Sequence, residues 1–148
     1  MAKRIGKTIA EATALAGLLD IAAAALLASS SGMAPARMLR GLAAGPFPQA
    51  LHWGFAGAVL GLVTHFVIMA LMASVFMLAW RGIGFVRAHP LICGMLYGVG
   101  LWCVMYFIVL PMRWPTLFRT HEPKDVVIQL FCHVILVGLP MGWIARRQ

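Results

Sequence analysis

The sequence predicts an all-α protein, a transmembrane four-helix bundle formed by a single domain. Of its 148 residues, 62% are apolar and only 11% are charged, whereas a typical soluble domain is about 45–50% apolar and roughly 25% charged. The mean hydropathy is +0.91. Four stretches are long and apolar enough to cross a hydrocarbon core about 30 Å thick as helices. The composition excludes a disordered chain and a typical soluble enzyme.

The expected spans cover residues 8–30, 52–80, 90–110 and 126–144. The first has the basic start and Ala-rich middle of a signal peptide, but Glu11 and Asp20 interrupt it. A cleaved signal needs no carboxylate there, so we interpret this stretch as a retained helix.

Prolines mark the later spans. Pro90 suits the first turn of the third span, where a missing N–H costs nothing, and we expect Pro111 and Pro115 to end that helix. Pro140 lies inside the fourth span, where we expect a kink.

Residues 33–45, between the first two spans, are too few and too polar to cross a membrane. Met38, Leu39 and Leu42 alternate there with Arg37 and Arg40. This pattern suits a short helix lying at the membrane interface, with a plain linker as the alternative.

The net charge of +8 comes from basic residues that stand at the ends of the apolar stretches. This distribution is typical of anchors in a lipid bilayer, with anionic lipid headgroups as partners, and we expect no nucleic-acid partner. With the N-terminus in the cytoplasm, the inner side carries Lys3, Arg4, Lys7, Arg81, Arg87, Arg146 and Arg147. The outer side carries Arg37, Arg40, Arg113, Arg119 and Lys124. This excess predicts that both termini are cytoplasmic.

Weak internal similarity suggests two tandem helical hairpins. Gly17-Leu18-Leu19-Asp20 corresponds to Gly94-Met95-Leu96-Tyr97, and Leu62-Val63-Thr64-His65 corresponds to Leu130-Phe131-Cys132-His133. The hairpins would be related by an axis along the membrane normal, which makes His65 and His133 equivalent positions.

Three ionisable residues are expected at one depth near mid-membrane. Asp20 lies 13 residues after Lys7, His133 lies 13 before Arg146, and His65 lies 16 before Arg81. At 1.5 Å per residue, each is about 20–24 Å from the inner anchors. A charged Asp costs at least about 2.5–3.5 kcal/mol at this depth, so we expect Asp20 to face the bundle interior and meet a histidine.

Two further groups accompany this polar cluster. Tyr97 is expected somewhat nearer the inner side as its fourth member. Asp125, Gln129 and His133 are spaced by four and form a polar stripe leading inward from the outer surface. The alternatives are that the cluster only holds the helices together through polar contacts, and that Asp125 and Gln129 only cap the last helix.

The chain resembles a group of uncharacterised small four-span bacterial inner-membrane proteins. The matching strings are Gly17-Leu18-Leu19-Asp20, Pro35 with Arg37 and Leu39, Leu60-Gly61-Leu62 leading to His65-Phe66, His89-Pro90-Leu91 with Gly94-Met95-Leu96-Tyr97-Gly98, and His133 through Gly138-Leu139-Pro140 to Arg147. A more distant similarity to the YagU-like proteins rests on Thr64-His65 and the tail from His133 to Arg147. The resemblance implies four spans in the bacterial inner membrane and no particular chemistry.

Three functions compete. The first is a non-enzymatic bundle that associates with a partner, a lipid, a membrane complex or another copy of itself. It is favoured because the chain has no phosphate-binding loop, nucleophile elbow, HExxH or CxxC motif, and we expect no cofactor. The second is a haem or transition-metal site that uses His65, His133 and Asp20 as ligands. The third is a proton or small-solute pathway through the same residues.

Overall fold

The computed structural model describes residues 2–113 and 122–148, with side chains from residue 5 onward. These residues form helices and connections, without any strand. Four helical stretches are long and apolar enough to span a membrane: Ile5–Ser30, Gly54–Gly82, Pro90–Arg113 and Pro123–Arg146. The predicted all-α fold with four spans is confirmed. Arg119 and the side chains of Lys3 and Arg4, which entered the charge count, lie outside the described residues.

The first two spans are each one helix, α1 (Ala2–Ser30) and α3 (Gly54–Gly82). The third span runs through α5 (Pro90–Val104), the π-helical segment η2 (Met105–Val109) and α6 (Leu110–Arg113). The fourth runs through α8 (Pro123–Phe131), the π-helical segment η3 (Cys132–Gly138) and α9 (Leu139–Arg146). Connecting elements are α2 (Pro35–Ala43), the 3₁₀ turn η1 (Pro48–His52) and α4 (Gly84–Ala88).

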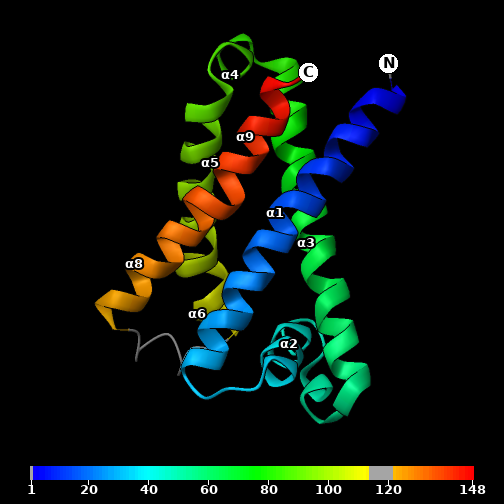
Figure 1. Cartoon of the computed structure of the whole chain (residues 1–148), viewed down its shortest axis with the longest axis vertical. Coiled ribbons are helices and arrows are strands. Elements are labelled where there is room, and N and C mark those ends of the chain that lie inside the picture. Colours follow the sequence, from blue (N-terminus) through cyan, green and yellow to red (C-terminus); the bar gives the residue numbers. More distant parts are fainter. Residues whose placement is uncertain (1, 114–121) are drawn as a thin grey trace.

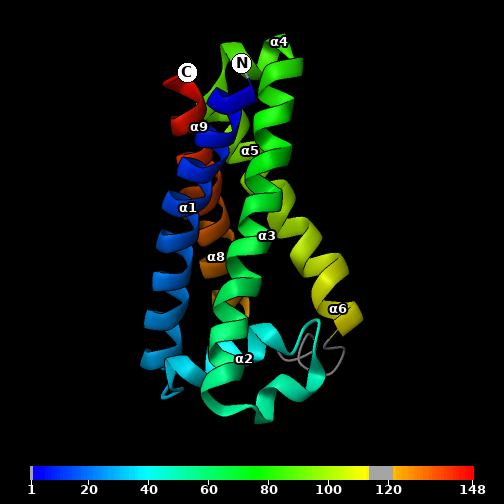
Figure 2. The same cartoon turned by 90° about the vertical axis from the view of Figure 1, so that its right-hand side faces the viewer.

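Both ends of the chain and α4 lie at one end of the bundle, here called the terminal end (Figure 1). The opposite end, the α2 end, carries α2, α6 and the start of α8. Helix α1 packs against α3, and α5 packs against η3 and α9, so each predicted hairpin has its two spans in contact. Contacts of α1 with η3 and α9 join the pairs. Figure 2 shows α2 lying across the end of α1 and the beginning of α3.

Each π-helical segment stands just before a proline, η2 before Pro111 and η3 before Pro140. A proline has no N–H for the carbonyl four residues earlier, and a widened turn absorbs that mismatch. The third helix continues beyond Pro111 to Arg113, so Pro111 alone does not end it, and Pro115, the second proline expected to end it, lies outside the described residues.

Glycines let the backbones approach closely. A Cβ on Gly94 would collide with the carbonyl of Gly138, and a Cβ on Gly98 with that of His133. On α3, a Cβ on Gly61 would collide with the carbonyl of Leu39 in α2. The residues expected to form an interfacial helix or a linker thus form a helix that packs on the glycine face of α3.

The apolar core fills the half of the bundle toward the terminal end. Small residues of α1, Ala12 and Ala16, lie against Phe76 and Met77 of α3 and Met141 of α9. The outer faces are as apolar as this core: Leu26, Phe55 and Leu71 are 72%, 83% and 66% exposed. Such exposure of large apolar side chains suits contact with lipid.

Candidate functional site

A cavity of about 470 Å³ lies between α1, α2, α3, η2 and the fourth span. Its polar lining comprises Asp20, Ser31, Thr64, His65, Gln129, Cys132 and His133. Asp20, His65 and His133 each stand four residues, or one helical turn, from the core residues Ala16, Met69 and Val137. The three side chains therefore form one layer directly below the apolar core.

His65 joins α3 to α1 at this layer. Its side chain is only 8% exposed, and its Nε2 atom lies 3.0 Å from the carbonyl oxygen of Gly17. A carbonyl only accepts hydrogen bonds, so Nε2 carries a hydrogen and donates it. Gly17 also allows the ring of Phe66, the residue after His65, to lie close to α1, because a Cβ at this position would strike that ring.

The other ring nitrogen of His65 faces a carboxylate. Nδ1 of His65 lies 4.0 Å from Oδ2 of Asp20, whose side chain is 23% exposed. A neutral ring with its hydrogen on Nε2 has only a lone pair at Nδ1, and an ionised carboxyl has only lone pairs. Two acceptors that face each other in a low-dielectric interior repel. A proton placed between Oδ2 of Asp20 and Nδ1 of His65 would relieve this repulsion.

His133 is held differently. Its Nδ1 donates a hydrogen to the carbonyl oxygen of Gln129 in the preceding turn, at 2.8 Å. His133 also interacts electrostatically with Asp20. His65 bonds across helices while His133 bonds within its own, so the two histidines predicted to be equivalent have different environments.

The stripe of Asp125, Gln129 and His133 borders a second cavity of about 730 Å³. Both cavities are lined by Leu27, Ser31, Met105, Gln129 and His133. The second reaches Lys124 and Asp125 at the start of α8. The two cavities thus adjoin one another and form a vestibule that extends from the α2 end to Asp20.

Tyr97 is not brought to this cavity. Its hydroxyl donates a hydrogen bond to the carbonyl oxygen of Met72 in α3, at 3.0 Å, and its ring lies 5.3 Å from that of Phe76. Tyr97 thus ties α5 to α3 behind the cavity wall.

The sequence pattern did not lead us to expect methionines among the residues that line the cavity. Five of the chain's ten line the 470 Å³ cavity, namely Met33, Met38, Met69, Met72 and Met105. The spacing of Met69 and Met72 from His65, four and seven residues, placed them on one face of α3 and was a usable signal. Flexible thioethers give the cavity an apolar wall that adapts to the shape of a ligand.

A metal centre is not formed by these side chains. Across residues 2–113 and 122–148, no group of three or more His, Cys, Asp or Glu side chains is placed to hold a metal ion. The site expected from Asp20, His65 and His133 is therefore absent from this structure. The physical reason for this absence is that Nε2 of His65, the atom an axial haem ligand would use, is directed at the Gly17 carbonyl.

No protein family, curated protein or solved structure matches the chain. The resemblance to small bacterial inner-membrane proteins accordingly stays a prediction.

Proposed function

We propose that this chain is a non-enzymatic membrane protein that binds a small, partly apolar cation in the 470 Å³ cavity and releases the Asp20–His65 proton in exchange. The observation that carries the proposal is the contact between Asp20 and His65 at the inner end of the vestibule, with 4.0 Å between Oδ2 and Nδ1. The function combines the expected non-enzymatic bundle with the expected solute pathway.

The charge of the ligand follows from the carboxyl group. An ionised Asp this deep in a membrane is costly unless a positive charge accompanies it. The accompanying charge is either the shared proton or a cation that replaces it. Proton and cation then compete for one group, which couples the binding of one to the release of the other.

The apolar part of the ligand follows from the lining. Apart from its polar residues, the cavity wall consists of five methionines and of aliphatic side chains such as Leu27, Leu42 and Ile68. Its volume falls within the range of about 300–1,000 Å³ typical of small-molecule sites. A small inorganic ion would leave most of this wall without a contact.

The vestibule lies toward the α2 end of the described bundle. The apolar core lies between Asp20 and the terminal end, whereas polar residues continue from Asp20 to Asp125. With both termini in the cytoplasm of a bacterial cell, as the Lys and Arg distribution predicts, the cavity takes its ligand from the outer side of the inner membrane.

The test is calorimetric titration of the purified protein in mild detergent with tetraphenylphosphonium, an apolar monovalent cation. Wild type should bind it more tightly as pH rises, because fewer protons compete. Repeating the titration in buffers of different ionisation enthalpy should reveal about one proton released per cation. Asp20→Asn should weaken binding at least tenfold and abolish the release.

The matched control is Glu11→Gln, which removes an exposed carboxylate of the same helix that pairs with Lys7 at 3.7 Å. It should bind as wild type does. Absence of binding by wild type, equal binding by Asp20→Asn, or binding without proton release would overturn the proposal.

A further inference from the structure

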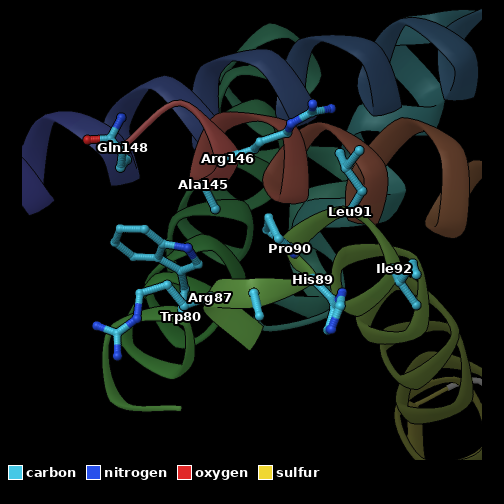
Figure 3. A pocket seen from close by; sticks show the side chains of 10 residues that line it. Trp80, Arg87, His89, Pro90, Leu91, Ile92, Ala145, Arg146 and Gln148 are labelled. Carbon is cyan, nitrogen blue, oxygen red and sulfur yellow. The ribbon is translucent and has the colours of Figure 1, made fainter. Parts of the chain in front are cut away.

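A second kind of site lies at the terminal end of the bundle. A cavity of about 640 Å³ is bounded by the end of α3, by α4, by the start of α5 and by the end of α9. It is lined by Trp80, Arg87, His89, Pro90, Arg146 and Gln148, among others. In Figure 3, Arg87 and Arg146 stand on opposite sides of Pro90, and the Trp80 ring lies next to Arg87. A smaller cavity of about 360 Å³ shares Trp80, Arg87 and Gln148 with it and adds Arg81.

Within the described part of the chain, the arginines of these cavities have no aspartate or glutamate partner. The chain has four acidic residues. Glu11 pairs with Lys7, Glu122 pairs with Lys124, Asp20 faces His65, and Asp125 lies at the α2 end. No aspartate or glutamate therefore offsets the charges of Arg81, Arg87 and Arg146, which come from three separate elements, α3, α4 and α9. The carboxylate of Gln148, which lines both cavities, can offset only one of the three.

The start of α5 adds to this positive field. Pro90 occupies its first turn, and no side chain caps it. The free amides of a helix start carry a partial positive charge that favours phosphate oxygens. Arginine side chains donate paired hydrogen bonds to the same oxygens.

The position of the cavity distinguishes a lipid from a dissolved phosphate. Trp80 stands at the end of a span, where tryptophan marks the depth of the lipid headgroups. Ile92, which is 53% exposed, lines the cavity on the side toward the membrane interior. A headgroup bound by the arginines would thus have apolar side chains beneath it for its acyl chains.

We infer that this arginine-lined cavity binds the phosphate of one anionic phospholipid, with Arg87 and Arg146 as its principal contacts. Arg147 gives an internal contrast. Its guanidinium carbon lies 3.3 Å from the centre of the Trp143 ring, and it does not line the cavity. Adjacent arginines at the same end of the same helix therefore differ in their expected part in binding.

The experiment is native mass spectrometry of the detergent-solubilised protein titrated with phosphatidylglycerol or with phosphatidylcholine of the same acyl chains. Wild type should retain one phosphatidylglycerol at least tenfold more tightly than phosphatidylcholine. Arg87→Gln and Arg146→Gln should each weaken phosphatidylglycerol binding about fivefold, which is the effect of one basic residue near an anionic lipid. Arg147→Gln should change it less than twofold.

Three results would overturn the inference. Equal retention of the two lipids would show that the negative charge of the headgroup does not determine binding. Equal losses in Arg146→Gln and Arg147→Gln would indicate diffuse surface attraction rather than a site. Displacement of the lipid by millimolar inorganic phosphate would assign the cavity to a dissolved anion. Since Arg87 and Arg146 are exposed, the thermal unfolding of each variant should match wild type, which checks that the fold is intact.

Discussion

His65 and Gly17 hold α3 and α1 together through a hydrogen bond of 3.0 Å from Nε2 to a backbone carbonyl. The same bond determines that Nδ1 faces Asp20, one turn further along α1. One histidine therefore has two tasks, namely helix packing and contact with the carboxyl group. Substitutions at this position can separate the two tasks.

His65→Ala should destabilise the bundle by about 1–3 kcal/mol, because it removes the hydrogen bond between α3 and the Gly17 carbonyl and leaves an unfilled space at a buried position. His65→Gln should recover part of this loss, since an amide can donate to the same carbonyl. The measurement is reversible unfolding in mixed detergent micelles. His52→Ala is the control, because His52 is exposed, and it should lose less than about 0.5 kcal/mol. Equal stability of His65→Ala and wild type would show that the bond adds nothing.

Gly98→Ala should destabilise the contact between α5 and η3. A Cβ at this position collides with the carbonyl of His133, so the two helices must separate, at a cost of roughly 1–3 kcal/mol. Gly100→Ala, two residues away, meets nothing within 4 Å and should be neutral or slightly stabilising, because alanine favours a helix. Unfolding midpoints of the two variants give the comparison. Similar midpoints would contradict the close approach.

The sequence was sufficient for the fold, because four long apolar stretches in one chain leave few other structures in a membrane. The distances of Asp20, His65 and His133 from basic anchors predict a common depth for them, and all three line one cavity in the structure. Tyr97 was expected as a fourth member somewhat nearer the inner side. Its hydroxyl bonds instead to the carbonyl of Met72, seven residues or about two turns beyond His65 on α3, and the residue does not line the cavity.

Two further features could not be derived from local patterns. The continuation of the third helix past Pro111 depends on a widened turn, and nothing in the sequence between 105 and 109 identifies it. The methionine lining depends on Met33 and Met38, which reach the cavity only because α2 folds back onto α3. Long-range packing determines both features.

Arg113→Gln should loosen α2. The Nε and Nη2 atoms of Arg113 donate hydrogen bonds to the carbonyl oxygens of Gly45 and Ala44, at 2.6 and 2.8 Å, and so connect α6 to the end of α2. Hydrogen–deuterium exchange over residues 35–50 should rise several-fold in the variant. Arg37→Gln removes an equal charge from the exposed face of α2 and should leave the exchange unchanged. Equal exchange in both variants would mean that α2 is held by α3 alone.

Cysteine accessibility should map the vestibule and its side of the membrane. In a background where Cys93, Cys103 and Cys132 are replaced by Ala, Gln129→Cys should react quickly with a charged thiosulfonate, because Gln129 lines both cavities. Val137→Cys, two turns further into the apolar core at 1% exposure, should react at least tenfold more slowly. In intact spheroplasts Gln129→Cys should still react, since the α2 end faces outward when both termini are cytoplasmic. Reaction only after lysis would reverse the orientation, and equal rates at both positions would contradict closure of the vestibule by the core.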